Sequence, residues 1–314
     1  MPAPRILVIR GGAIGDFILT LPALRLLREN IPGCQLEVLG YPGIAELAVR
    51  AELADATRSL GHRDMALLFV PGAAISDEVT SYLRSFNLVV SYLFDPDGIL
   101  RDNLKRLGVK TLLECPHRVQ PGGGPAAAQL ARPLENLAFY LDDPAPRFPD
   151  PPDSAGTSEP AAQFILHPGS GSTQKTWPLK RWLAVLEQLA LSCPDNALRV
   201  IAVTGEAEEE RGLLAMLRDF THPQIALDLW HQLPLPELAT RLQHQARAGA
   251  KFLGHDSGIG HLAAACGLPC LLLFGPTNPA IWAPQNIGVT ALKAPGGDLE
   301  KLSVADVLDA LQGG

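Results

Sequence analysis

The feature that most constrains the fold is an alternation of strand-like and helical segments, which starts near the N-terminus and starts again halfway along the chain. Short apolar runs such as RILVIR (5–10) and FILHPG (164–169) are typical of buried parallel strands. Each run is followed by a loop and then by a segment with helical spacing of apolar residues. Because parallel strands need crossover connections, this order predicts two doubly wound α/β halves.

A segment of different composition separates the two halves. Residues 142–162 are rich in proline, acidic and small residues and have no hydrophobic period, which is typical of a linker. We therefore predict an N-terminal Rossmann-like domain at 1–145, a proline-rich linker at 146–162 and a C-terminal Rossmann-like domain at 163–314. A ligand-binding cleft is expected between the two domains.

Hydrophobic spacing and capping residues place the individual elements. Strands are expected at 5–10, 35–40, 88–93, 110–115, 164–169, 198–205, 224–229, 250–254 and 269–275. Helices are expected after Thr20, the predicted N-cap, and at 44–53, 76–86, 98–107, 125–141, 178–191, 206–220, 235–245, 259–266 and 298–311.

Composition excludes several classes of protein. A net charge of −7 argues against a general nucleic-acid binder, which needs a basic surface. No stretch approaches the roughly 20 continuous apolar residues of a membrane span. The five cysteines lack the spacing of a zinc site, so we expect buried free thiols in a reducing cytoplasm and no bound metal.

The loop after the first strand carries the first candidate site. Gly12 and Gly15 match the last two glycines of a dinucleotide fingerprint, but Arg10 stands where its first glycine should be. Asp16 would repel a pyrophosphate in this loop. Its carboxylate suits the removal of a proton from a hydroxyl group, although a helix-capping role is an equal alternative.

The loop after the strand at 164–169 is suited to an anion. Ser170 and its glycine and hydroxyl neighbours allow backbone N–H groups to gather, and Lys175 adds a positive charge at the end of a strand. The alternative is that Lys175 is an ordinary surface lysine. Trp177 and Trp182 lie on the apolar face of the next helix, where we expect packing rather than ligand stacking.

The turn after the strand at 250–254 is the third candidate. Asp256, Ser257 and Gly258 follow the strand directly and begin a helix that contains His261. Such turns bind anions through free N–H groups and the helix dipole. Asp256 and Ser257 are also good N-cap residues, so a capped helix without a ligand is the alternative. His167, at another strand end, would join this set around a diphosphate.

The glutamate run at 206–210 follows the strand at 198–205. Acidic residues in the first turn of a helix stabilise the helix dipole, which is the simpler explanation. A carboxylate after such a strand also accepts hydrogen bonds from ribose hydroxyls in nucleotide-binding folds.

Three blocks together resemble glycosyltransferase family 9, the ADP-heptose:lipopolysaccharide heptosyltransferases. The blocks are ILVIRGGAIGDFILTLPALRLLR (6–28), HPGSGSTQKTWPLKRW (167–182) and GHDSGIGHLAAACGLPCLLLFGPTNPAIWAP (254–284). They occur in the family's order, and the similarity spans nearly the whole chain. The resemblance implies a GT-B fold, with the acceptor bound by the N-terminal half and the nucleotide sugar by the C-terminal half.

The resemblance also implies roles for individual residues. Asp16 would be the catalytic base, and Lys175 would stabilise the diphosphate of the donor. The acceptor-side loop would contain Gly11, Gly12 and Gly15. Donor-binding residues would be Ser170, Lys175, Glu208, Glu209, Asp256, Ser257, Gly258 and His261. Of the two glutamates, Glu209 is favoured over Glu208 as the ribose-binding residue.

The implied reaction is the inverting, metal-independent transfer of heptose from ADP-heptose, with ADP as product and no cofactor. The acceptor would be a phosphorylated, lipid A-linked glycan of the lipopolysaccharide core, and the enzyme would be cytoplasmic and work at the inner membrane surface. The alternatives are a sugar-nucleotide epimerase of the same fold, an NAD-dependent oxidoreductase and a non-catalytic nucleotide-sugar binder.

Overall fold

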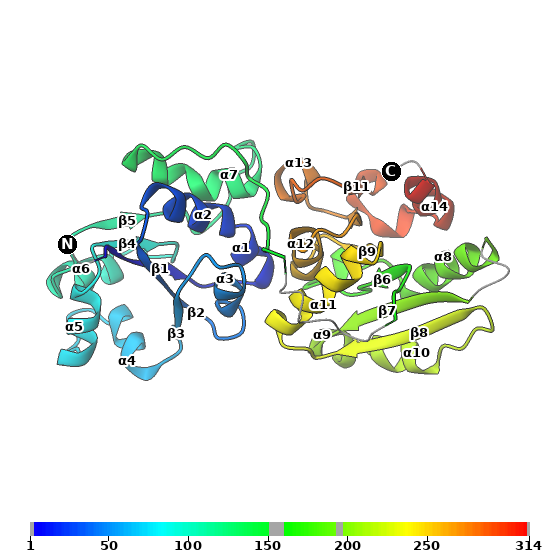
Figure 1. The fold of residues 1–314 in the computed structure, drawn as a ribbon, viewed down its shortest axis with the longest axis horizontal. Coiled ribbons are helices and arrows are strands. Elements are labelled where there is room, and N and C mark those ends of the chain that lie inside the picture. The colour runs from blue at the N-terminus through cyan, green and yellow to red at the C-terminus, as the bar shows by residue number, and fades with distance from the viewer. Residues whose placement is uncertain (1–2, 151–159, 193–196, 313–314) are drawn as a thin grey trace. The chain divides into compact units, whose positions relative to one another are not determined.

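The chain divides into two compact units in its computed structural model, unit 1 from Met1 to Pro144 and unit 2 from Ala145 to Gly314 (Figure 1). The described residues are 3–150, 160–192 and 197–312. Part of the predicted linker, 151–159, therefore lies outside the described residues. So does Cys193, one of the five cysteines predicted to be buried free thiols.

Unit 1 is an α/β unit whose strands and helices alternate. In chain order its elements are β1 (Arg5–Arg10), α1 (Ile14–Ile18), α2 (Leu21–Asn30), β2 (Gln35–Gly40), α3 (Glu46–Arg50), β3 (Ala56–Ser59), α4 (Arg63–Ala66), the 3-10 helix η1 (Leu67–Phe69), α5 (Asp77–Arg84), β4 (Leu88–Ser91), α6 (Ile99–Arg106), β5 (Leu112–Glu114), α7 (Ala126–Ala131) and the 3-10 helix η2 (Arg132–Leu137).

The described strands of unit 1 form one parallel sheet in the order β3-β2-β1-β4-β5. Val8 on β1 is in register with Val38 on β2 and with Val90 on β4. Successive side chains of β1 point to opposite faces, and both faces are buried. Leu7 and Ile9 pack against α5 and α6, while α2 and α7 lie together on the other face (Figure 1).

Unit 2 repeats this alternation. In chain order its elements are β6 (Phe164–Leu166), the 3-10 helix η4 (Thr173–Lys175), α8 (Leu179–Leu191), β7 (Leu198–Thr204), α9 (Glu206–Glu210), α10 (Leu213–Asp219), β8 (Ile225–His231), α11 (Leu235–Arg247), β9 (Lys251–His255), α12 (Gly258–Ala265), β10 (Cys270–Phe274), α13 (Pro279–Trp282), β11 (Val289–Lys293), the 3-10 helices η5 (Pro295–Gly297) and η6 (Leu299–Lys301), and α14 (Val304–Gln312).

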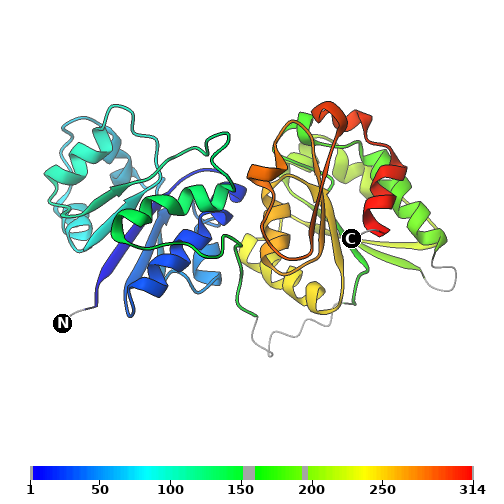
Figure 2. The same ribbon diagram turned by 90° about the horizontal axis from the view of Figure 1, so that it is seen from above.

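The sheet of unit 2 has the order β11-β10-β9-β6-β7-β8, again with parallel pairs. A core that contains Trp177, Trp182 and Leu186 covers one face, where α8 lies beside α14 (Figure 2). In both sheets the chain winds first to one side and then to the other. The reversal lies between β1 and β4 in unit 1 and between β6 and β9 in unit 2, and open α/β sheets bind ligands at the carboxyl ends of such strand pairs.

Several element boundaries differ from the sequence predictions. The predicted helix at 206–220 is divided at Gly212, whose φ of +74° interrupts the helical backbone. The predicted helix at 125–141 ends at Ala131 and continues as a 3-10 helix, because Pro133 has no N–H to donate to the preceding turn. The C-terminal helix predicted at 298–311 begins only at Val304.

Thr20 does not cap α2 as predicted. Its backbone is already helical, and its hydroxyl donates a hydrogen bond to the main-chain oxygen of Asp16 at 2.8 Å. Two edge strands, β3 and β11, were not predicted, since their sequences ATRS and VTALK carry few large apolar residues.

The first residues of the predicted linker pack on unit 2. Phe148 is buried, and its N–H donates to the main-chain oxygen of Ala265 at 3.1 Å. The Gln243 amide donates to the Pro149 oxygen at 2.8 Å. Over the described part of the chain, no helix is both long and apolar enough to cross a membrane.

Candidate functional site

The main group of predicted site residues lies at the carboxyl ends of β6 and β9, the two strands between which the winding of unit 2 reverses. Lys175 ends the loop after β6, and Asp256 follows β9 directly. The Lys175 ammonium donates to Asp256 Oδ2 at 2.7 Å. The topology of the sheet thus brings together two residues that are 81 positions apart in the sequence.

Asp256 is the centre of this group. Its side chain is 5% exposed, and Oδ2 also accepts a hydrogen bond from the Thr277 hydroxyl at 2.6 Å. Burial raises the pKa of the Asp256 carboxyl, but the His261 imidazole and the Lys175 ammonium lower this pKa more. The net shift of the pKa is downward, so the carboxylate is ionised at neutral pH.

The helix α12 starts beside this carboxylate. Ser257 is its N-cap, with Oγ accepting a hydrogen bond from the Gly260 N–H at 3.1 Å, and Gly258 is the first helical residue. His261 is buried, with Nε2 3.8 Å from Asp256 Oδ1, and among the described residues its Nδ1 has no hydrogen-bond partner. Ser257, rather than Asp256, thus takes the capping role, which leaves Asp256 available to Lys175.

The loop after β6 is held in place by buried groups. The His255 side chain is fully buried, and its Nε2 accepts a hydrogen bond from the Trp177 N–H at 2.8 Å. Its Nδ1 lies 3.1 Å from the Gly169 oxygen. Burial lowers the pKa of His255 to about 3, so the ring is neutral at neutral pH. Trp177 and Trp182 are both buried in the core, which confirms that they serve packing.

Ser170 lies in the same loop and is also buried. Its main-chain oxygen accepts a hydrogen bond from the Arg211 guanidinium at 2.7 Å, while its hydroxyl has no partner in the described part of the chain. Buried polar atoms usually have partners, so the unpartnered hydroxyl is consistent with a bound ligand in this loop.

The two candidate glutamates of α9 have different environments. Glu208 is buried, and its Oε2 accepts a hydrogen bond from the Gly205 N–H at 2.7 Å, while Oε1 lies 3.7 Å from His167 Nε2. A Cβ at Gly169 would lie 1.7 Å from Glu208 Oε1, so a larger residue there would displace the Glu208 side chain. The Glu209 side chain is 53% exposed, and its Oε2 lies 3.4 Å from His231 Nε2.

His167, which was predicted to lie beside a diphosphate, is a buried side chain at the carboxyl end of β6. Burial lowers its pKa to about 4, so at neutral pH the ring carries no positive charge for a diphosphate. The nearest charged group to its Nε2 that the structure records is the Glu208 carboxylate on α9.

The remaining predicted residues lie in unit 1, at the carboxyl end of β1. Gly12 has a φ of +103°, a backbone conformation that favours glycine, and a Cβ there would lie 3.3 Å from Asp16 Oδ2. Asp16 belongs to α1, together with Gly15, and its main-chain oxygen accepts a hydrogen bond from the buried Arg10 guanidinium at 3.1 Å. No described group donates a hydrogen bond to the Asp16 carboxylate, which is partly exposed.

The comparison with known families decides the family to which this chain belongs. The sequence pattern of glycosyltransferase family 9 (heptosyltransferase) matches residues 128–310, more than half of the chain. The chain belongs to glycosyltransferase family 9. It is therefore a glycosyl-transferring enzyme, as the three sequence blocks predicted.

Relatives of this family 9 chain are distant in sequence but similar in length. Lipopolysaccharide heptosyltransferase 1 of Salmonella typhimurium is 25% identical over 96% of this chain and 98% of that protein. The enzyme of the same name from Pseudomonas aeruginosa is 25% identical over 88% of this chain and 79% of that protein.

Solved structures confirm the predicted fold. The glycosyl transferase family 9 structure from Veillonella parvula has a TM-score of 0.76 at 17% identity, covering 99% of this chain and 96% of that one. The structure of the ADP-heptose lps heptosyltransferase II of E. coli has a TM-score of 0.74 at 16% identity, covering 98% of both chains. The family 9 chain accordingly has the GT-B fold, with two α/β units.

Two residues of this group were missed by sequence reasoning. Thr277 hydrogen-bonds Asp256, and His255 holds the loop after β6. Thr277 follows β10, the neighbour of β9, so the rule that parallel strands end at one edge of a sheet could have found it. His255 carried no signal beyond its place at a strand end.

Proposed function

We propose that this enzyme transfers heptose from ADP-heptose to a hydroxyl of a phosphorylated, lipid A-linked glycan of the lipopolysaccharide core. The transfer is a single displacement with inversion at the anomeric carbon, and it uses no metal or cofactor. Membership of family 9 and the names of the relatives support this choice over epimerisation or hydride transfer. The acceptor is a lipid-linked molecule at the inner membrane surface, so the enzyme acts there.

The observation that carries the donor half of this proposal is the Lys175–Asp256 pair at the reversal point of the unit 2 sheet. The N–H groups of Gly258 and its neighbours open α12, an eight-residue helix, and helix N-termini attract phosphates. Lys175 adds a positive charge whose side chain is 31% exposed and thus accessible to a ligand. Together these groups suit a nucleoside diphosphate.

The remaining donor residues complete the proposed site. Ser170 offers its unpartnered hydroxyl to the phosphates, and His261 lies next to Asp256. Glu209 accepts hydrogen bonds from the ribose hydroxyls. Its carboxylate is more accessible than that of Glu208, which already accepts a hydrogen bond from the Gly205 N–H.

In the proposed reaction, Asp16 takes the proton of the acceptor hydroxyl as its oxygen attacks the anomeric carbon. The new glycosidic bond forms while the bond from this carbon to the diphosphate oxygen breaks, and ADP leaves with the bonding electrons. Lys175 and the N–H groups at the start of α12 stabilise the charge that develops on the diphosphate. The Asp16 carboxylate accepts no hydrogen bond from any residue that the structure describes, so it is available for this proton transfer.

The Asp16→Asn variant tests the catalytic assignment. General base catalysis typically contributes about 10²–10⁴-fold, so kcat should fall by that factor while ADP affinity stays unchanged. Transfer is followed by mass spectrometry of the glycosylated acceptor, with and without a chelator. The matched control is Asp77→Asn, on the exposed first turn of α5. Full turnover by Asp16→Asn would remove Asp16 from the base role, and loss of turnover on chelation would contradict metal independence.

A further inference from the structure

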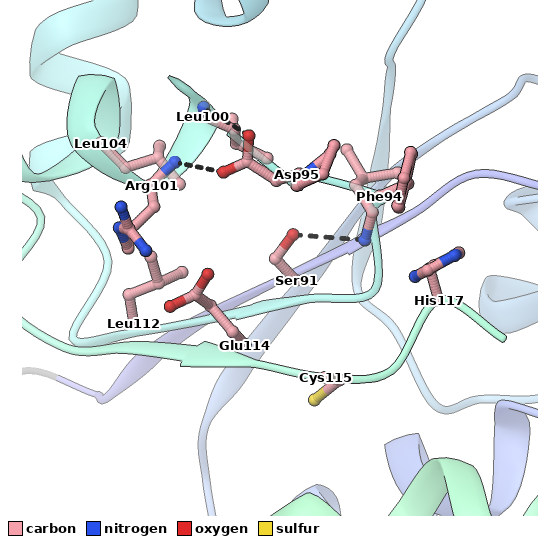
Figure 3. Close-up of a pocket in the computed structure, with 12 residues that line it drawn as sticks. Ser91, Phe94, Asp95, Leu100, Arg101, Leu104, Leu112, Glu114, Cys115 and His117 are labelled. Atoms are coloured by element: carbon pink, nitrogen blue, oxygen red, sulfur yellow. Dashed lines mark hydrogen bonds between the residues drawn. The ribbon is translucent and has the colours of Figure 1, made fainter. Parts of the chain in front are cut away.

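Unit 1 contains a cavity that none of the predicted site residues lines. Its volume is about 230 Å³, and it opens at the carboxyl ends of β4 and β5, beside the start of α6 (Figure 3). We name it the β4–β5 pocket. The side chains that give it chemical character are Phe94, Asp95, Arg101, Glu114 and His117.

The β4–β5 pocket lies next to the loop that carries Asp16. β4 pairs directly with β1, and the winding of the unit 1 sheet reverses between these two strands. Leu93 lines the pocket, and a Cβ at Gly11 would lie 3.3 Å from Leu93 Cδ2. The pocket and the predicted acceptor-side loop are therefore neighbours on one edge of the same sheet.

One wall of the pocket is aromatic. The Phe94 side chain is 63% exposed, and its ring centre lies 4.4 Å from that of His117 at an angle of 48°. Figure 3 shows both rings on the same side of the pocket. Aromatic faces at the mouth of a pocket pack well against the apolar C–H face of a sugar ring. The hydroxyl groups of the sugar then form hydrogen bonds with polar side chains.

The opposite side of the pocket is polar, and its charged side chains differ in whether they have hydrogen-bond partners. Asp95 accepts hydrogen bonds from the N–H groups of Leu100 and Arg101 at 3.1 and 2.9 Å, so it is fixed as a cap of α6. Arg101 is paired with Asp102 through Nε at 3.0 Å. The Glu114 carboxylate points into the pocket and accepts no hydrogen bond from any described residue (Figure 3).

Glu114 decides the class of ligand. A carboxylate with free oxygens accepts hydrogen bonds from neighbouring hydroxyl groups, but it repels phosphate and carboxylate groups, and Asp95 nearby adds to this repulsion. The volume is below the roughly 300–1,000 Å³ of pockets for drug-sized ligands, so one sugar residue fits better than a whole nucleotide sugar.

We propose that the β4–β5 pocket binds a neutral, hydroxyl-rich sugar residue of the acceptor glycan, beside the residue whose hydroxyl reacts at Asp16. Phe94 and His117 contact the C–H face of this sugar, and Glu114 accepts hydrogen bonds from its hydroxyls. The pocket thereby selects acceptors by the residue next to the reactive one. This assignment rests on the glycosyl transfer proposed above.

Direct binding tests the pocket independently of transfer. Saturation-transfer NMR of the full-length protein with methyl α-glucoside should show signals from ring C–H groups, and glucuronate should give weaker ones. The signals should be lost in Phe94→Ala and retained in Phe94→Trp, which keeps an aromatic face. Equal signals from wild type and Phe94→Ala, or from both sugars, would overturn the proposal.

Kinetics then tests the role of the pocket in the reaction. With ADP-heptose and core acceptors in which the sugar next to the reactive one is neutral or phosphorylated, Phe94→Ala and Glu114→Gln should each raise KM for the neutral acceptor about tenfold. Donor KM should not change. Glu114→Gln should also reduce the preference for the neutral over the phosphorylated acceptor.

The control is Tyr140→Ala, which removes an aromatic side chain of unit 1 that is 65% exposed and does not line the pocket. An acceptor KM within twofold of wild type in the pocket variants, or an equal rise in Tyr140→Ala, would overturn the proposal. If wild type transfers no heptose but binds methyl α-glucoside through Phe94, the proposed function fails while the sugar pocket stands.

Discussion

At the scale of single residues, Asp256 shows how the same side chain can suit two roles. Its position after β9 made it a candidate for capping α12, and Ser257 in fact takes that role. Asp256 instead accepts hydrogen bonds from Lys175 and Thr277, on loops after two different strands. A buried carboxylate with these donors orients Lys175, which is the group proposed to meet the diphosphate.

Replacing Lys175 by alanine should weaken ADP binding about 10- to 100-fold, because a charge-assisted hydrogen bond contributes about 1.5–3 kcal/mol. Isothermal titration calorimetry with ADP measures the change. The control is Lys180→Ala, an exposed lysine at the start of α8, whose ADP affinity should equal that of wild type. An unchanged affinity in Lys175→Ala would make Lys175 an ordinary surface lysine.

Buried histidines should make the stability of the fold depend on pH. Burial lowers the pKa of His167 to about 4 and that of His255 to about 3, below their unfolded value of 6.5. Below about pH 6.5 the unfolded chain therefore binds protons that the folded chain does not. The free energy of unfolding should fall by about 1.4 kcal/mol per pH unit for each histidine down to about pH 4.

The His167→Asn variant checks this dependence by urea unfolding at several pH values. As the pH is lowered, the free energy of unfolding of this variant should fall less steeply than that of wild type. The difference in slope should correspond to one proton fewer taken up on unfolding. A slope in His167→Asn equal to that of wild type would contradict the assignment of a neutral, buried ring.

At the scale of elements, the start of α12 serves both the stability of the helix and the proposed binding of the donor. The Ser257 hydroxyl accepts the Gly260 N–H, which satisfies one free donor of the helix and leaves others to meet an anion. An N-cap of the same kind occurs in unit 1, where Ser76 Oγ accepts the Val79 N–H at 3.4 Å. The two caps differ in their surroundings, since only Ser257 lies beside Asp256.

Because the surroundings of the two N-caps differ, replacing each serine by alanine should have different effects on ADP binding. Ser257→Ala and Ser76→Ala should each cost about 1 kcal/mol of stability, measured by chemical unfolding. Only Ser257→Ala should also weaken ADP binding, measured by calorimetry. If the two variants bind ADP equally well, the start of α12 caps a helix and does not contact the donor.

At the scale of the whole molecule, each unit has its own parallel sheet and its own core. The four tryptophans of the sequence, at positions 177, 182, 230 and 282, all fall within unit 2. Trp177 and Trp182 pack edge to face in its core, with ring centres 5.0 Å apart. Tryptophan fluorescence therefore reports the unfolding of unit 2 alone.

A ligand of unit 2 should stabilise the transition seen by fluorescence. ADP at 100 times its Kd should add about 2.7 kcal/mol to the free energy of unfolding of unit 2. Lys175→Ala should show a smaller gain at the same ADP concentration, and UDP should stabilise wild type less than ADP does. An equal effect of ADP and UDP would contradict the proposed adenine nucleotide donor.

Much of the architecture could be predicted from local sequence. The strands at 5–10 and 198–204 are long apolar runs, so they were placed within a residue of their observed ends. The short edge strands β3 and β11 were missed because half-exposed strands need few apolar residues. Gly212 and Pro133 moved helix ends through backbone geometry, which hydrophobic spacing does not record.

The candidate site was predictable by type of residue and by loop, but its contacts were not. The loops at 170–175 and 256–261 were predicted as candidate sites because their polar groups follow apolar strands. That Lys175 reaches Asp256 depends on the β11-β10-β9-β6-β7-β8 order of the sheet, in which β6 and β9 are neighbours. His167 was expected near a diphosphate, and only its burial shows that its ring is neutral.

The sequence by itself determined that the chain forms two α/β halves and which loops carry polar chemistry, because apolar periodicity and loop composition are local properties. Only the tertiary structure decided which of these loops meet. Strand order brings β9 beside β6 and β4 beside β1, and burial then sets the charge of each group. The β4–β5 pocket is the clearest case, since Phe94 and Glu114 come from segments that the sheet alone places side by side.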